Sequence, residues 1–138
     1  MDMKYLCDPH VVPTVVPGNL SDLVAYARGC AEYTDALHVD IADGKFAPNT
    51  TWPFVQNEQM AEVASFRSLV NIPSHLKLEV HLMVESPEEI GMEFARAGFS
   101  ITAHIEAFAD AAAAHAALGL WKDAGAPAVG LAAKLDTA

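Results

Sequence analysis

The sequence has few basic residues and few cysteines. Lysine and arginine total 8 against 18 aspartates and glutamates, a formal net charge of -10. This balance argues against nucleic acid and anionic membrane surfaces as main partners. The two cysteines, Cys7 and Cys30, have no Cys-x-x-Cys spacing, so neither a disulfide framework nor a thiolate zinc site is expected. We therefore expect a reducing, cytoplasmic setting.

Long hydrophobic runs are also absent. No segment approaches the ~20 apolar residues of a membrane-spanning helix, and the N-terminal stretch from Met1 to Leu6 has no apolar region of the signal-peptide kind. We expect neither secretion nor membrane anchoring. With 138 residues, 52% of them hydrophobic, the chain can bury one sizeable core. We predict a single domain over residues 1–138.

Strand and helix patterns alternate along the chain. Apolar or alternating runs with many β-branched residues predict strands over Val11–Val16, Ala36–Ile41, Leu76–Met83, Ser100–Ile105 and Ala128–Ala133. Helical spacing follows each of the first four. This alternation predicts an α/β fold with a parallel sheet and right-handed crossovers. Periodicity alone does not distinguish a barrel from a doubly wound sandwich.

Start signals mark the predicted helices. Asn19 or Ser21 can cap the first, and Pro53 suits the first turn of the second. Ser86 and Glu89 are spaced as a capping box for the third, and the fourth is expected to run from Ala109 to Ala124. The core face of the second helix is expected to include Phe54, Met60, Val63, Ala64 and Phe66.

Two ionisable residues interrupt the apolar run Ala36–Ile41. His38 and Asp40 point to the same face because side chains alternate along a strand. An unpaired carboxylate on a buried face is costly. The pair can therefore be a hydrogen-bonded tie between two elements, or a pair of metal ligands that needs a further ligand from elsewhere. His81 and His104 end two other predicted strands, where catalytic groups of parallel sheets gather.

Three segments of the sequence resemble the ribulose-phosphate 3-epimerase family. They are residues 38–49 (HVDIADGKFAPN), residues 80–88 (VHLMVESPE) and residues 103–107 (AHIEA). The resemblance extends from Val11 to about Ala133. It implies a parallel (β/α) barrel of the TIM type, here incomplete, with about five of its βα units.

The resemblance also implies a site. His38, Asp40 and His81 would bind a divalent metal, zinc or iron(II), with manganese or cobalt as alternatives. Asp40 would also be a catalytic acid/base group at C3 of a pentose phosphate, which passes through a cis-enediolate. Thr14, His81 and Met83 would contact the substrate, with Thr14 standing where the family usually has serine. Because three ligands are already assigned, we expect His104 to be a packed, hydrogen-bonded histidine.

The implied reaction interconverts D-ribulose 5-phosphate and D-xylulose 5-phosphate in the pentose phosphate pathway. The 138 residues hold no counterpart of the family's second catalytic aspartate, also its fourth ligand, or of its phosphate-binding loops. A complete barrel takes roughly 200–250 residues. We therefore expect either a truncated gene product, or a homo-oligomer or barrel-completing partner. The alternative is a non-catalytic metal-binding or assembly half-barrel.

Overall fold

Five parallel strands form one sheet. The computed structural model describes residues 11–55, 60–66 and 71–137. Its elements are β1 (Thr14–Val15), α1 (Leu20–Cys30), β2 (Ala36–Ala42), α2 (Met60–Ala64), β3 (Lys77–Met83), α4 (Pro87–Arg96), β4 (Ser100–His104), the short 3-10 helix η3 (Ile105–Ala107), α5 (Ala111–Ala124) and β5 (Val129–Ala132). The predicted α/β class is confirmed.

The strands lie in the order β1-β2-β3-β4-β5, and every neighbouring pair is parallel. A doubly wound sheet reverses its strand order at a switch point, whereas a TIM-type barrel adds each strand beside the previous one. The order therefore settles the choice that periodicity left open. The sheet is the sheet of a partial TIM-type barrel, with β1 and β5 at its edges in the part of the chain described.

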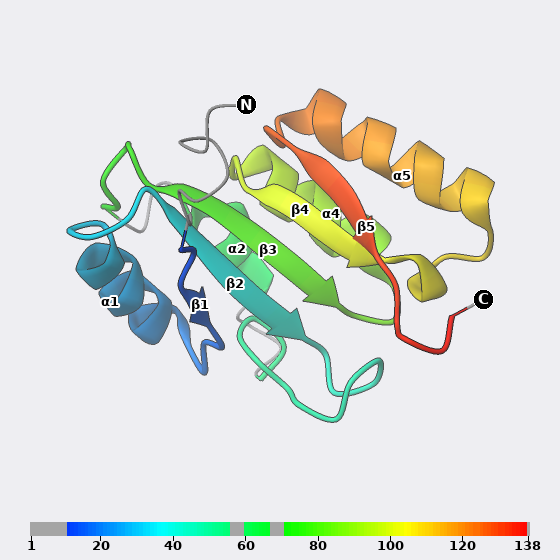
Figure 1. Ribbon diagram of the computed structural model, residues 1–138, viewed down its shortest axis with the longest axis horizontal. Helices are drawn as coiled ribbons and strands as arrows, with labels where there is room; N and C mark the ends of the chain where they lie inside the picture. Colours follow the sequence, from blue (N-terminus) through cyan, green and yellow to red (C-terminus); the bar gives the residue numbers. More distant parts are fainter. Residues whose placement is uncertain (1–10, 56–59, 67–70, 138) are drawn as a thin grey trace, which may run out of the picture.

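The two faces of the sheet differ in chemistry. Apolar side chains of β2, β3 and β4 are buried on one face, namely Leu37, Val39, Ile41, Val80, Leu82, Ile101 and Ala103. Figure 1 shows α2 and α4 behind the sheet, with α1 and α5 at its two edges. None of the described helices covers the front face, which carries the polar side chains that alternate with the core residues.

Capping explains where two of the helices begin. The Asn19 side chain accepts a hydrogen bond of 2.8 Å from the backbone N–H of Asp22, and Asp110 accepts one of 2.7 Å from that of Ala113. The Asp110 cap starts α5 at Ala111, two residues later than predicted. Pro87 opens α4 as expected, but Ser86 makes no side-chain capping bond, so the predicted capping box is wrong.

The helix predicted to begin at Pro53 is also wrong. Residues 52–54 form turns after a cis Trp52–Pro53 bond, and α2 begins only at Met60. The backbone N–H of Trp52 donates to the carbonyl of Pro17 over 2.9 Å, and the Trp52 side chain is fully buried. These contacts fix residues 52–54 in turns where a first helical turn was expected.

The second predicted helix and the first predicted strand are each confirmed only in part. Val63 and Phe66 are buried as predicted, whereas Ala64 is exposed and residues 56–59 lie outside the described residues. The first strand comprises only Thr14–Val15, which is shorter than the predicted Val11–Val16. Pro13 has no N–H for a strand ladder, and the predicted strand ends Val11 and Val16 are 73% and 59% exposed.

The helices α4 and α5 meet at a glycine. A Cβ atom on Gly91 of α4 would lie 2.2 Å from Cε2 of Trp121 on α5. The buried Trp121 indole also donates to the carbonyl of Glu88 over 3.2 Å. Gly91 therefore allows α4 and α5 to approach each other closely. No helix in the described part of the chain is long and apolar enough to cross a membrane.

Candidate metal centre

The register of β2 and β3 brings four polar side chains together. Asp40 is the strand partner of His81, and His38 is the partner of Glu79. Partners in parallel strands point to the same side of the sheet. All four side chains therefore lie on the face without helices, and each is only partly buried.

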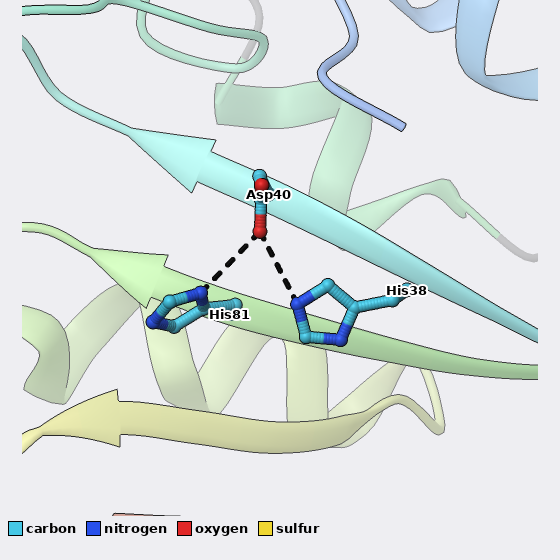
Figure 2. Close-up of side chains that lie close together, drawn as sticks. All are labelled: His38, Asp40 and His81. Atoms are coloured by element: carbon cyan, nitrogen blue, oxygen red, sulfur yellow. Dashed lines mark ion pairs between the residues drawn. The ribbon is translucent and has the colours of Figure 1, made fainter. Parts of the chain in front are cut away.

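Asp40 lies between the two histidines. Its Oδ1 atom is 3.2 Å from Nε2 of His38 and 3.3 Å from Nδ1 of His81 (Figure 2). The three side chains are each 23% exposed. One donor atom from each residue lies within 4.8 Å of the other two. The structure thus brings together the three residues that the sequence predicted as ligands.

This arrangement fits a divalent metal. Zinc binds imidazole nitrogen and carboxylate oxygen at about 2.0–2.1 Å, so two ligand atoms of a tetrahedral site lie about 3.3 Å apart. The two distances from Asp40 match that separation. Three protein ligands leave a position open, as in catalytic sites. His38, Asp40 and His81 can therefore hold an ion that still accepts an outside ligand.

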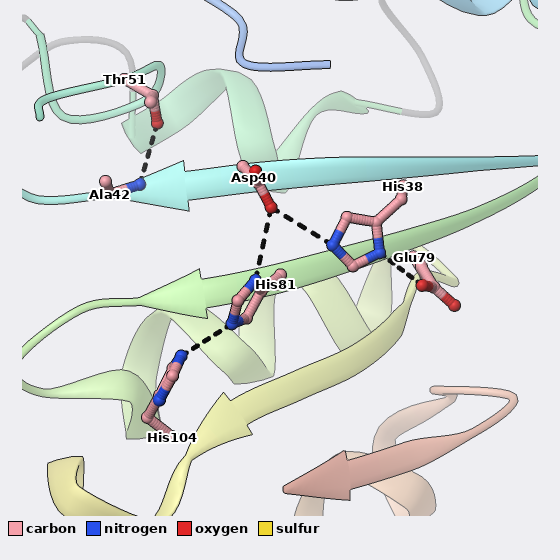
Figure 3. A network of polar contacts seen from close by, with 7 residues as sticks. All are labelled: His38, Asp40, Ala42, Thr51, Glu79, His81 and His104. Atoms are coloured by element: carbon pink, nitrogen blue, oxygen red, sulfur yellow. Dashed lines mark hydrogen bonds and ion pairs between the residues drawn. The ribbon is translucent and has the colours of Figure 1, made fainter. Parts of the chain in front are cut away.

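Each histidine has a second partner on its outer nitrogen. Nδ1 of His38 contacts the Glu79 carboxylate, and Nε2 of His81 lies 2.8 Å from Nε2 of His104 (Figure 3). The His81 and His104 ring centroids lie 4.9 Å apart with 23° between the ring planes, so His104 is packed and hydrogen-bonded as predicted. The alternation of Lys77, Glu79 and His81 in the sequence places Glu79 on the same face as His81, but its contact with His38 depends on the strand register.

The surroundings of His81 favour its neutral form. Burial lowers the pKa of His81 below its ordinary value of 6.5, and the nearby His104 and His38 lower it further, whereas Asp40 opposes the shift. A metal binds neutral imidazole. His81 is therefore in the form that a ligand requires at neutral pH.

The Ribulose-phosphate 3 epimerase family model matches residues 10–138. The chain belongs to the ribulose-phosphate 3-epimerase family. Similar curated proteins include the ribulose-phosphate 3-epimerase of Mycobacterium leprae, 31% identical over 102 residues that cover 72% of this chain and 40% of that protein. The Bacillus subtilis enzyme of the same name is 37% identical over 75 residues, covering 53% of this chain and 30% of that protein.

A plant relative gives a similar match. The chloroplastic ribulose-5-phosphate-3-epimerase of Arabidopsis thaliana is 33% identical over 97 residues, which cover 66% of this chain and 29% of that protein. The chain thus spans less than half the length of the ribulose-phosphate 3-epimerases it matches.

In this member of the epimerase family, hydrogen bonds hold both ends of the loop that follows β2, at Asp43 and at Thr51. Asp43 accepts hydrogen bonds from the backbone N–H groups of Lys45, Phe46 and Glu85, over 2.9, 2.9 and 2.8 Å. Burial raises the pKa of Asp43, but these three amides outweigh it and hold the pKa below 3.8. Thr51, which is 2% exposed, accepts from the Ala42 N–H over 3.0 Å.

Thr14 and Met83, the other two residues expected to contact a substrate, lie on strands that neighbour the ligand residues. Thr14 is exposed on β1 and is the strand partner of His38. Met83 ends β3, half-buried, as the partner of Ala42, which is 1% exposed. A cavity of about 480 Å³ lies elsewhere, at the opposite ends of β3 and β4, and does not include the metal-binding group.

Proposed function

We propose that this chain supplies the metal-binding part of an enzyme that interconverts D-ribulose 5-phosphate and D-xylulose 5-phosphate at C3. One observation supports the proposal most: an Asp40 carboxylate held between His38 and His81 on the open face of a barrel sheet. The names of the relatives supply the reaction. Residues 1–138 would form one partial barrel domain.

The proposed cofactor is a divalent ion held by His38, Asp40 and His81. Zinc or iron(II) suits two imidazoles and one carboxylate, with manganese or cobalt as alternatives. Such an ion supplies Lewis-acid stabilisation of negative charge on the substrate oxygens. Glu79 accepts from Nδ1 of His38 and so turns its Nε2 lone pair toward the ion.

Asp40 is the proposed acid/base group at C3. Its side chain is 23% exposed on the open face, so a sugar bound there can reach its second carboxylate oxygen. Removing the C3 proton gives an enediolate, and returning a proton to the other side inverts C3. Thr14 and Met83, from the neighbouring strands, would line the substrate, with His81 contacting it as well.

The proposal includes a partner for the sheet. β1 and β5 are edges in the described part of the chain, and edge strands carry unpaired ladder groups. Leu131 on β5 is 43% exposed. We propose that further strands, from another copy or another segment, complete the barrel and bring the second acid/base group and the phosphate site. The cytoplasmic setting stays a prediction from the cysteine content.

Zinc titration tests the metal site. Isothermal titration should show one site per chain in the wild type, and His81→Ala should weaken binding by at least tenfold because one of three ligands is lost. His115→Ala makes the same chemical change on the exposed side of α5 and is the matched control. Equal affinity in all three proteins would remove His81 from the site.

Proton exchange tests the chemistry. One base suffices to exchange the C3 proton, whereas inversion needs a group on each side of the enediolate. Zinc-loaded chain in D₂O should therefore exchange the C3 proton of ribulose 5-phosphate, seen by proton NMR, with little xylulose 5-phosphate formed. Asp40→Asn should abolish exchange, and Asp123→Asn on the exposed part of α5 should not.

The outcomes separate the candidate functions. Inversion that rises steeply with protein concentration would indicate that chains complete the barrel for one another. Fast inversion independent of concentration would contradict the need for a second acid/base group. Zinc binding without exchange would favour the non-catalytic metal-binding or assembly half-barrel.

A further inference from the structure

The polar network continues beyond the proposed metal ligands to His104 and Glu106. His81 Nε2 lies 2.8 Å from His104 Nε2, and His104 Nδ1 lies 3.3 Å from Oε2 of Glu106. His104 Nδ1 and Glu106 Oε2 are both buried, and neither makes a well-aligned hydrogen bond, although the two atoms lie at ion-pair distance. Buried polar atoms in this condition call for an explanation.

Glu106 has only one oxygen free for this contact. Its Oε1 accepts from the backbone N–H of Lys134 and from the hydroxyl of Thr137. The Thr137 hydroxyl and the Lys134 amide lower the pKa of Glu106 to about 2. Glu106 is therefore a carboxylate, which only accepts, and its Oε2 faces His104.

The proton positions follow from this acceptor. A neutral imidazole carries one N–H, and between two facing nitrogens one donates and the other accepts. Suppose that His81 carries its proton on Nδ1, toward Asp40. His81 Nε2 then accepts from His104, whose Nδ1 lone pair faces the Glu106 carboxylate. Two buried acceptors, His104 Nδ1 and Glu106 Oε2, would then face each other without a proton between them, which is unfavourable.

The opposite arrangement gives His104 a donor that faces the Glu106 carboxylate. With its proton on Nε2, His81 donates to His104 Nε2, and the Nδ1–H of His104 faces Oε2 of Glu106. The Nδ1 lone pair of His81 then points toward Oδ1 of Asp40. Glu79 does the same for His38, whose Nε2 also faces Oδ1. Three acceptors converge on one point, which suits a cation.

We propose that His104 and Glu106 are positioning residues, which hold His81 in the Nε2–H tautomer with its Nδ1 lone pair directed at the metal site. The inference rests on the proposed metal centre and assigns a role to two residues outside the ligand set. A metal-ligating histidine commonly donates its other N–H to a fixed acceptor, and loss of such a partner weakens metal binding by about 10–100-fold.

Glu106→Gln replaces the acceptor that faces His104 Nδ1 with a donor, with almost no change of shape. The amide oxygen must take the place of Oε1, because two donors, Lys134 N–H and the Thr137 hydroxyl, meet there. The NH₂ group then faces His104 Nδ1 and donates to it. His104 becomes an Nε2–H donor, so His81 must accept on Nε2 and carry its proton on Nδ1. We expect zinc affinity to fall about 10–100-fold.

His104→Phe is the second variant. The phenyl ring keeps the packing on Phe46, whose ring centroid lies 5.0 Å from that of His104, but it removes the acceptor for His81. Its zinc affinity should fall in the same range. Glu89→Gln, the same chemical change at an exposed site on α4, is the control and should bind zinc as the wild type does.

The tautomer is the readout that a merely structural role would not change. Long-range proton–nitrogen NMR at pH 8 distinguishes the two nitrogens of His81 in metal-free protein. We expect Nε2–H in the wild type and Nδ1–H in Glu106→Gln. An Nδ1–H tautomer in the wild type, or zinc affinity unchanged in both variants, would overturn the inference without contradicting the proposed metal centre. A wild type that binds no zinc would contradict both the metal centre and the positioning role of His104 and Glu106.

Discussion

Gly91→Ala should destabilise the chain although alanine is the better helix former. The new Cβ would lie 2.2, 2.4 and 2.5 Å from three atoms of the buried Trp121 ring. Trp121 must retreat by at least about 1 Å, the difference between 2.2 Å and the 3.4 Å of an ordinary contact. Overpacking costs about 1–3 kcal/mol. Weakening the Trp121 bond to Glu88 adds up to about 1 kcal/mol.

The helix propensity of alanine offsets about 1 kcal/mol of this cost. We therefore expect a net loss of up to about 3 kcal/mol in the free energy of unfolding. Gly119→Ala is the matched control, because no atom lies within 4 Å of a Cβ at that exposed position of α5. It should stabilise the chain by up to about 1 kcal/mol.

Urea unfolding followed by far-UV circular dichroism gives both values, since the midpoint and slope together yield the free energy. Trp121→Phe removes part of the obstructing ring, so Gly91→Ala should cost less in that background than in the wild type. If Gly91→Ala and Gly119→Ala changed stability equally, the close approach of α4 and α5 would be refuted.

Two further predictions concern the loop after β2. Asp43→Asn should cost roughly 1–2 kcal/mol at pH 7, because its NH₂ group would face the N–H of Glu85. The pKa of Asp43 is lowered in the folded chain, so this stability is present above pH 3.8 and is lost as the pH falls further. If urea unfolding at pH 3 gave as large a difference in unfolding free energy between wild type and variant as at pH 7, this prediction would be contradicted. Thr51→Val should cost about 1–3 kcal/mol by leaving the buried Ala42 N–H unpaired, whereas Thr51→Ser should match the wild type in the same assay.

The alternating pattern of residues predicted the sheet well. β2, β3, β4 and β5 lie where their runs were expected, with shifts of at most one residue at the ends. Strong alternation determines which face a residue takes, so the positions of His38, Asp40 and His81 on one face followed directly. Their convergence from two strands needed the family resemblance, since periodicity does not fix the register.

The failures have a common physical cause. Pro53 gives the local signal of a helix start, yet the chain there is fixed by distant partners, the Pro17 carbonyl and the buried surroundings of Trp52. Ser86 likewise has the spacing of a cap but makes no capping bond. Contacts between residues far apart in the sequence override local preference, and no local pattern reports them.

Glu79 and Glu106 show the same limit at the site. In the sequence, Glu79 lies in the middle of the predicted strand Leu76–Met83, and Glu106 directly follows the predicted strand Ser100–Ile105. Their contacts with His38 and His104 arise from strand pairing and from the return of residues 134–137 toward η3. The alternation of Lys77, Glu79 and His81 could have suggested the first contact. The second depends on a tertiary approach for which the sequence carries no signal.

The two-faced chemistry of β2 has a consequence for how the chain finds its fold. If β2 paired with its neighbours one residue out of step, its alternate side chains would exchange faces. Val39 and Ile41 would leave the core, at roughly 1.5–3 kcal/mol each, and Asp40 would be forced among apolar helices at a cost of several kcal/mol more. Few mispaired sheets could survive such a penalty. The polar cluster thereby also protects the chain from misfolding, before any ion or sugar is bound.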